Sequence, residues 1–262
     1  MISAGFLWLL SVVPLAAGFR TAVIAQSQHA RCVSPVCCDV SDVLPAGATD
    51  AIPPEKLADA WNREEKASQL SDVLKGCSLY LVGLGPKKTA VGRVLARRLV
   101  RYRYYDIGSL LTSTYQQVAK VEEPVTMPEL MAAEPLEDVE QLSSAVLQQV
   151  QAFSRSVFVT WDGAVGASDY AVMQQGIVVH IAQDAAAETA LLPKEGADEA
   201  LEKWQAGFEM ADVTVEVGEG DAADDAAYKV VDAVLSFVKK NPAKSVEWKA
   251  QADAKMAAQG GD

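Results

Sequence analysis

The sequence contains few cysteines and few histidines. Among its 262 residues there are four Cys and two His, and none of them has the paired spacing of a zinc site. Cys32, Cys37 and Cys38 lie close together near the N-terminus, and Cys77 stands alone. This usage does not support a disulfide framework, and it fits a reducing compartment.

Positive charge is also scarce. The chain has 23 Lys and Arg against 35 Asp and Glu, which gives a net charge of -12. An acidic surface repels phosphate backbones, so the sequence argues against a general nucleic-acid binder. Half of the residues are apolar and 22% are charged, which is the composition of a soluble globular protein. The length suits one good domain with extensions.

Residues 1–45 predict a targeting presequence. The apolar run from Phe6 to Ala17 is too short for a clear membrane span and contains a proline. It ends in small residues before Phe19, as a signal-peptide core does, although no Lys or Arg precedes it. The stretch that follows is basic and hydroxylated and has no acid before Asp39, which is typical of an organelle transit peptide.

This combination resembles the two-part presequence of algae with complex plastids. We therefore expect a chloroplast or plastid protein with no stable transmembrane span after processing. Two alternatives stay open: plain secretion, and an N-terminal helix that is buried or anchors the chain in a membrane.

Residues 46–75 predict a linker and a lead-in helix. Residues 46–54 are small residues and prolines, and residues 55–74 have the pattern of an amphipathic helix. The apolar positions of that helix are Leu57, Ala60, Trp61, Leu70, Val73 and Leu74. At the other end of the chain, residues 241–262 are polar and rich in alanine and predict a flexible tail.

Residues 76–240 alternate short apolar runs with longer helical stretches. The predicted strands are 78–82, 103–105, 156–160, 177–181 and 213–217. The predicted helices are 90–100, 109–119, 136–153, 168–175, 197–208 and 226–239. This alternation predicts right-handed crossovers and a parallel sheet that is covered on both faces.

A damaged phosphate-binding loop follows the first predicted strand. It reads Gly83-Leu84-Gly85-Pro86-Lys87-Lys88-Thr89. In a working loop, backbone N–H groups surround the phosphates, the lysine reaches the terminal phosphates and the next hydroxyl holds magnesium. Lys88 and Thr89 stand in that place, between a strand and a helix.

Three changes weaken this loop. Lys87 replaces a glycine, Pro86 lacks an N–H group, and the loop is one residue shorter than the pattern. Two adjacent lysines can still attract an anion to the start of a helix. Weak nucleotide or phosphate binding at Lys87, Lys88 and Thr89 therefore stays open, beside a solvated turn that binds nothing.

Four blocks of sequence give the chain a family resemblance. They are Leu74 to Gly83, Tyr102 to Asp106, Asp162 to Val165, and Ala211 to Val213. Through them the chain resembles shikimate kinase, and more closely the plastid shikimate-kinase-like proteins, which are regarded as inactive relatives. The resemblance implies a three-layer α/β/α nucleoside-monophosphate-kinase fold with a phosphate loop, a five-stranded parallel sheet and a lid.

The resemblance also implies four chemical sites, and each one is altered. The family's Asp-x-Asp motif is reduced to Asp106, because Gly108 replaces the second acid. Glu137 stands where an arginine grips the substrate carboxylate, which reverses the charge. Trp161 and Asp162 replace two members of a triple glycine, and no arginine occurs in the lid stretch 183–211.

Two further residues have more than one interpretation. Trp161 either plugs the old substrate pocket, which we favour, or recognises a new ligand. His180 is expected to be a core histidine with its hydrogen bonds satisfied, because no partner for a catalytic or metal-binding role is near it in the sequence.

These departures predict a catalytically inactive protein, and the resemblance to the plastid kinase-like proteins implies a role in plastid biogenesis as an interaction or assembly factor. Its expected partners are plastid proteins, with a thylakoid complex as one form of that role, and no cofactor is expected. A degenerate nucleotide and magnesium site is predicted at Lys87, Lys88, Thr89 and Asp106. The alternatives are an ATP- and magnesium-dependent small-molecule kinase, for shikimate or an altered substrate, and a regulatory nucleotide sensor.

Overall fold

The protein is described by a computed structural model that covers residues 54–121, 123–162, 166–183, 204–218 and 220–242, with the isolated residues 250 and 254. The chain divides into two units, Met1–Pro53 and Pro54–Asp262, and everything below concerns the second unit. The predicted presequence and linker, most of the predicted lid and nearly all of the predicted tail lie outside the described residues. In the described part, no helix combines the length and apolarity that crossing a membrane requires.

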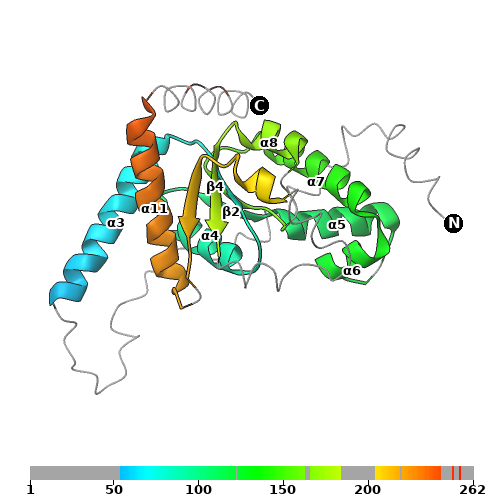
Figure 1. Ribbon diagram of the computed structural model, residues 1–262, viewed down its shortest axis with the longest axis horizontal. Coiled ribbons are helices and arrows are strands. Elements are labelled where there is room, and N and C mark those ends of the chain that lie inside the picture. The colour runs from blue at the N-terminus through cyan, green and yellow to red at the C-terminus, as the bar shows by residue number, and fades with distance from the viewer. Residues whose placement is uncertain are drawn as a thin grey trace, which may run out of the picture. The chain divides into compact units, whose positions relative to one another are not determined.

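Five strands form one parallel sheet in the order β2-β3-β1-β4-β5 (Figure 1). The strands are β1 (Leu79–Val82), β2 (Arg103–Asp106), β3 (Ser156–Val159), β4 (Ile177–Ala182) and β5 (Val213–Glu216). Each one lies within a residue of its predicted bounds, which confirms the sequence-based sheet. All residues of β1 and β3 are buried, as expected of strands in the middle of a sheet that is covered on both faces.

Helices precede, connect and follow the strands. They are α3 (Pro54–Leu74), α4 (Lys87–Arg98), α5 (Ile107–Ala119), α6 (Met127–Ala133), α7 (Leu136–Val150), α8 (Ala167–Met173) and α11 (Ala223–Lys240). The helix α6 was not predicted; it begins at a capping box in which the backbone N–H and hydroxyl of Thr126 donate to the Glu129 carboxylate.

The hydrophobic core has two parts, one on each face of the sheet. On one face, β-strand side chains such as Leu81 pack with residues of α3, α4 and α11. On the other, side chains such as Tyr80 and Phe158 pack with residues of α5, α7 and α8. Figure 1 shows these two groups of helices on opposite sides of the strands. The predicted three-layer arrangement is therefore confirmed.

The position of α4 is fixed by Gly92. A Cβ atom on this residue would lie 2.3 Å from Cγ2 of Val159 and 3.2 Å from Cδ1 of Leu81. The backbone of α4 at Gly92 therefore lies directly on the side chains of Val159 and Leu81. This close approach holds the start of α4 against the loop that follows β1.

The helix α3 is attached differently from the prediction. Trp61 is 75% exposed and Val73 is also exposed, so the predicted apolar face is wrong at these positions. The buried residues are in the second half of the helix, where Ala67, Leu70 and Leu74 face the core. The sequence pattern assigned exposed and buried residues to one apolar face. It did so because the first half of α3 is attached to its neighbours by charged side chains and not by apolar packing.

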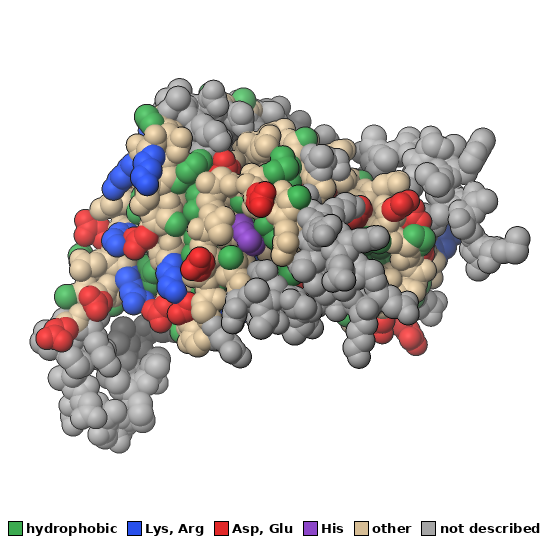
Figure 2. Space-filling view, in the orientation of Figure 1, with side chains coloured by type: hydrophobic (Ala, Val, Ile, Leu, Met, Phe, Trp, Pro, Cys, Tyr) green, Lys and Arg blue, Asp and Glu red, His purple; other side chains and the backbone are tan. Residues whose placement is uncertain are grey.

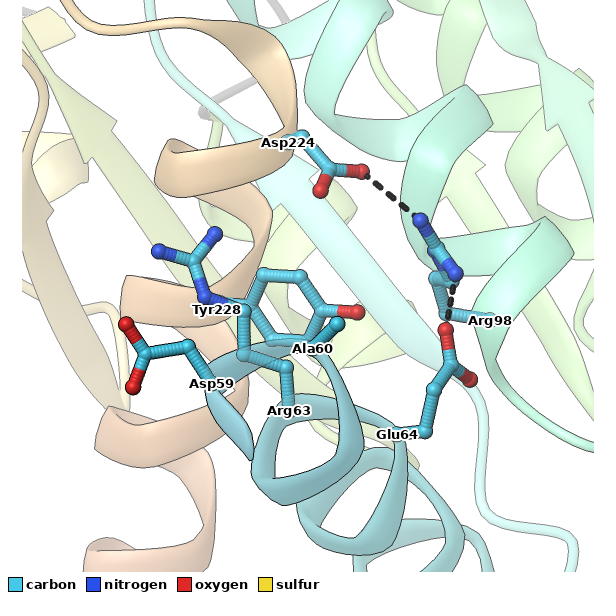
Figure 3. A pocket seen from close by; sticks show the side chains of 7 residues that line it. All are labelled: Asp59, Ala60, Arg63, Glu64, Arg98, Asp224 and Tyr228. Carbon is cyan, nitrogen blue, oxygen red and sulfur yellow. Dashed lines mark hydrogen bonds and ion pairs between the residues drawn. The ribbon is translucent and has the colours of Figure 1, made fainter. Parts of the chain in front are cut away.

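A cluster of charges joins the first half of α3 to α4 and α11 (Figure 3). The Arg98 guanidinium on α4 contacts both Glu64 of α3 and Asp224 of α11. The guanidinium groups of Arg63 and Arg98 lie 5.0 and 6.0 Å from the centre of the Tyr228 ring. Figure 2 shows side chains of both charges interspersed over this part of the surface. A single exposed ion pair contributes little to stability, whereas several charges that form a network contribute more.

Replacing Gly92 with alanine tests the close packing of α4. The added methyl group must displace Val159 or lift the helix, which should lower the free energy of unfolding by about 1–3 kcal/mol. This loss should appear although alanine is the better helix former by about 1 kcal/mol. Denaturant unfolding measures the effect. Gly220→Ala is the matched control, because nothing lies within 4 Å of a Cβ there, and equal stability of the two variants would contradict the packing.

Candidate functional site

The loop after β1 makes a tight turn at two glycines. Gly83 has a φ of 135°, and a Cβ there would lie 2.5 Å from the carbonyl oxygen of Ile181. Gly85 has a φ of 77°, which also favours glycine. Thus the loop keeps two of the glycines that let a backbone curl around a phosphate, although Lys87 has replaced the last one.

The helix α4 begins at Lys87 and not at Ala90, where the sequence pattern placed its start. The three predicted anion-binding residues, Lys87, Lys88 and Thr89, therefore all lie in its first turn. Pro86 precedes the helix, a place where its missing N–H group costs no intrahelical hydrogen bond. The predicted strand-to-helix context of the loop is confirmed.

Lys88 is the most buried charged side chain of the loop, with 2% of its surface exposed. Its ammonium group donates to the carbonyl oxygen of Gly83 at 2.6 Å and forms an ion pair with Asp162. Burial lowers the pKa of Lys88, and the negative charge of Asp162 opposes that shift. The lysine that would reach a phosphate points instead at a carboxylate of the same chain.

Asp162 lies just beyond β3 and receives two hydrogen bonds on one oxygen. Its Oδ1 atom accepts from the Lys88 ammonium and from the N–H group of Gly85, the latter at 3.2 Å. A lysine and a loop amide are the donors that a phosphate loop offers to a phosphate. Sequence reasoning missed this contact, because it considered Asp162 only for the family resemblance, as a residue in place of a glycine. The available clue was its place after β3, which neighbours β1 in the sheet.

Two further contacts fasten the loop to the ends of the neighbouring strands. The Lys87 ammonium donates to the carbonyl oxygen of Gly218 beyond β5 at 2.5 Å. The amide of Gln183, just after β4, donates to the carbonyl oxygen of Leu84. Because β4 lies between β1 and β5, the Lys87 side chain spans the carboxyl end of β4. Ligands of open α/β sheets bind at this edge.

Asp106, the fourth predicted site residue, caps a helix. Its Oδ1 atom accepts from the N–H group of Ser109 at 3.1 Å, and its Oδ2 atom accepts from the hydroxyl of Tyr104 at 3.2 Å. Burial, aided by the charge of Asp106, raises the pKa of Tyr104 to about 12, so this hydroxyl keeps its proton.

Few magnesium ligands remain among these residues. Both oxygens of Asp106 already accept hydrogen bonds, and Gly108 supplies no second carboxylate. In the part of the chain that the structure describes, no three His, Cys, Asp or Glu side chains group as ligands of a metal ion. Thr89 is half-buried in the first turn of α4. Thr89 and Asp106 are the two groups left for magnesium, which proteins usually hold with one or two side chains together with waters and phosphate oxygens.

Trp161 fills the space between the end of β3 and the helices α5 and α7. It is 6% exposed, and its indole N–H donates to the hydroxyl oxygen of Ser143 on α7 at 2.8 Å. A Cβ on Gly108 of α5 would lie 3.7 Å from the Cβ of Trp161. A buried indole with a satisfied N–H group is a packed core residue, so the structure favours the plug over a recognition residue.

Glu137 lies in the first turn of α7 and is exposed. With Glu140 and Asp169 it lines an open groove of about 500 Å³ between α7 and α8. Carboxylates on the wall of a groove disfavour an anionic substrate such as a carboxylic acid. The charge reversal seen in the sequence therefore lies on an accessible surface.

His180 is not the satisfied core histidine that the sequence predicted. It is half-buried on β4, and its ring stacks on Phe208 with centres 4.4 Å apart. Its Nε2 atom is buried and has no hydrogen-bond partner among the described residues. Burial lowers the pKa of His180 to about 4, so the ring is neutral at physiological pH.

Comparison with known proteins relates the chain to shikimate kinases. It is 32% identical over 112 residues to the shikimate kinase of Synechococcus elongatus, an alignment that covers 42% of this chain and 54% of that protein, about half its length. It is 27% identical over 185 residues to the shikimate kinase of Nostoc punctiforme, covering 65% of this chain and 97% of that protein. No family model matches the chain.

The fold agrees with these alignments. The crystal structure of shikimate kinase from Bacteroides thetaiotaomicron superposes with a TM-score of 0.50 at 18% sequence identity, covering 61% of this chain and 98% of that one. The chain is thus homologous to shikimate kinases in sequence and has the nucleoside-monophosphate-kinase type of fold.

His180 should make the protein sensitive to acid. Its pKa of about 4 in the folded state lies below the ordinary value of about 6.5, so below pH 6.5 the unfolded chain binds the proton first. The stability present above pH 6.5 is therefore lost as the pH falls towards 4. In His180→Phe, which keeps a ring against Phe208, this loss should shrink by about 2 kcal/mol between pH 7 and 4.5.

Urea unfolding of both proteins at several pH values, at constant ionic strength, measures this difference. Parallel acid limbs for the two proteins would show that the His180 ring is not kept neutral by burial.

Proposed function

We propose that this chain is a catalytically inactive relative of shikimate kinase that acts in the plastid as an interaction or assembly factor in plastid biogenesis. Its partners on this proposal are plastid proteins, including a thylakoid complex. The kinase fold then serves as a stable scaffold, and the chain needs neither ATP nor magnesium for its role.

One observation carries the loss of activity in this proposal. Trp161 packs into the place where the family resemblance puts a glycine backbone against the substrate ring, and its N–H group is bonded to the buried Ser143. Opening that space requires breaking a buried hydrogen bond and removing a large aromatic side chain from the core. The observation supports a lost substrate site more strongly than any change in the phosphate loop.

The state of the other groups agrees with this proposal. Phosphoryl transfer depends on positioning and on neutralising negative charge. Asp106 is engaged as a helix cap, Glu137 has the wrong sign for a carboxylate substrate, and Lys88 is paired within the chain. Each change acts on a different part of the chemistry, so a single compensating residue does not restore all of them.

The competing function is an ATP- and magnesium-dependent small-molecule kinase, for shikimate or an altered substrate. The retained Gly83, Gly85, Lys88 and Thr89 in the strand-to-helix context favour it. A third function, a nucleotide sensor, needs nucleotide binding without turnover. Calorimetry with ATP and ADP at millimolar concentration separates the sensor from the proposal, since a scaffold should give no heat of binding.

A coupled kinase assay with shikimate, ATP and magnesium tests the loss of activity. We expect turnover below about 10⁻³ s⁻¹, against the roughly 1–100 s⁻¹ of ordinary kinases. A bacterial shikimate kinase measured in parallel is the positive control. Trp161→Gly should also stay inactive, because Trp161 is only one of several changes from the family pattern. Turnover by the unaltered chain near ordinary kinase rates would contradict the proposal.

Affinity purification from isolated plastids tests the interaction role. A tagged full-length chain should recover the same protein partner in repeated preparations, and the tagged bacterial kinase should not. Import of the full chain into isolated plastids, with shortening at its N-terminus, tests the location. A chain that stays outside the organelle would contradict the plastid assignment.

A further inference from the structure

The Lys88 ammonium is a buried cation and therefore needs an anionic partner. Removing a charge from water costs several kcal/mol unless an opposite charge and hydrogen bonds compensate. Of the two groups that Lys88 bonds, the carbonyl of Gly83 is neutral and the carboxylate of Asp162 is charged. The charge of Asp106 also favours the protonated Lys88, but Asp162 has the carboxylate that contacts the ammonium group.

The Asp162 carboxylate occupies the position of a bound oxyanion. A single oxygen, Oδ1, accepts from the loop amide of Gly85 at 3.2 Å and from the Lys88 ammonium. Glycines with positive φ at residues 83 and 85 shape the turn that presents this amide. The loop therefore keeps one amide and one ammonium group as anion donors, and the chain itself supplies the anion.

The two halves of this ion pair differ in their freedom. Lys88 is 2% exposed and lies in the first turn of a helix packed directly on the sheet. Asp162 is 42% exposed and lies beyond the end of β3. Rotation of the Asp162 side chain into water leaves the donor set in place, whereas Lys88 cannot leave without opening the core. Asp162 is the replaceable half.

We infer that the phosphate loop is a latent oxyanion site closed by Asp162, and that a phosphate-type ligand binds there only by displacing this carboxylate. The inference rests on the proposal that the chain does not transfer phosphate, and it adds what holds the nucleotide side of the site shut. The loop is then a self-occupied site whose ligand class is the inorganic oxyanion or the phosphate end of a larger molecule.

An internal competitor weakens binding without removing the site. A tethered group acts at an effective concentration in the millimolar range, and the apparent affinity of an external ligand falls by the fraction of chains in which the site is open. The contact of Lys87 with Gly218 holds the loop in the same closed arrangement from the β5 side. Removing the charge of Asp162 should therefore expose an anion site that the unaltered chain conceals.

Pyrophosphate binding to the full chain tests this inference. Asp162→Asn keeps the size of the side chain and removes its charge, so the variant should bind pyrophosphate at least about tenfold more tightly than the unaltered chain. In chloride buffer its melting temperature should be lower by about 4–8 °C, because Lys88 has lost its counter-charge, and pyrophosphate should restore much of this loss. Calorimetry and thermal unfolding at equal ionic strength measure both effects.

Two variants serve as controls. Asp225→Asn removes one negative charge from an exposed pair with Arg63, so it should bind pyrophosphate as the unaltered chain does. The double variant Lys88→Met with Asp162→Asn removes the cation as well and should lose the gain. If Asp162→Asn binds no more tightly than the unaltered chain, or if the double variant keeps the gain, the inference is wrong.

A measurement on the unaltered chain covers the case in which Asp162→Asn does not fold. The Gly85 amide resonance should shift with pyrophosphate as the carboxylate is displaced, and no shift up to about 50 mM, well above a millimolar effective concentration, overturns the inference. These outcomes are separate from the kinase assay. Turnover by the unaltered chain would contradict the proposal of an inactive relative. If Asp162→Asn does not bind pyrophosphate more tightly, only the inference about the loop is wrong, and the role proposed for Trp161 is unaffected.

Discussion

Burying the Lys88 ammonium is the constraint on which the carboxyl edge of the sheet depends. Because Gly92 has no side chain, α4 packs closely on the strands, and Lys88 in its first turn is buried. A cation in such a place requires an anion, and Asp162 provides it from the end of β3. One ion pair thus joins the loop after β1, the start of α4 and the end of β3. In a nucleotide-binding relative the phosphate would make this connection.

On the proposed function, the two sides of the ancestral active site are closed by different means. On the phosphate side the closure is electrostatic, through Asp162 on Lys88 and through Lys87 on the β5 end. On the substrate side it is steric, because Trp161 packs against α5 and α7 and bonds Ser143. An electrostatic closure exchanges one anion for another at small cost, whereas a packed indole does not leave without a cavity. If the chain is the inactive relative that we propose, the substrate side is therefore the more permanently lost.

Much of the fold follows from the sequence because buried parallel strands are short apolar runs between turns. This accounts for β1 and β3, which are buried throughout and lie within a residue of their predicted bounds. The helix α6 was missed, since its capping box was not considered and its seven residues carry little periodicity. Trp61 was predicted to be buried, but it is exposed. A hydrophobic pattern does not show whether a helix is attached to its neighbours by apolar packing or by charged side chains. His180 was expected to have its hydrogen bonds satisfied. The sequence pattern does not reveal that the ring of Phe208 stacks on the His180 ring.

The sequence by itself determined the layered α/β fold, the place of the loop and the loss of four family motifs, because these depend on local pattern and residue type. Only the tertiary structure decided what replaced the lost groups. Asp162 lies 74 residues from Lys88 in the chain, and Trp161 lies 18 residues from Ser143. Parallel pairing of β1 with β3 brings the first pair together, and the crossing of α7 over the sheet brings the second. Contacts of this kind arise from strand order and helix packing, which residue spacing does not encode.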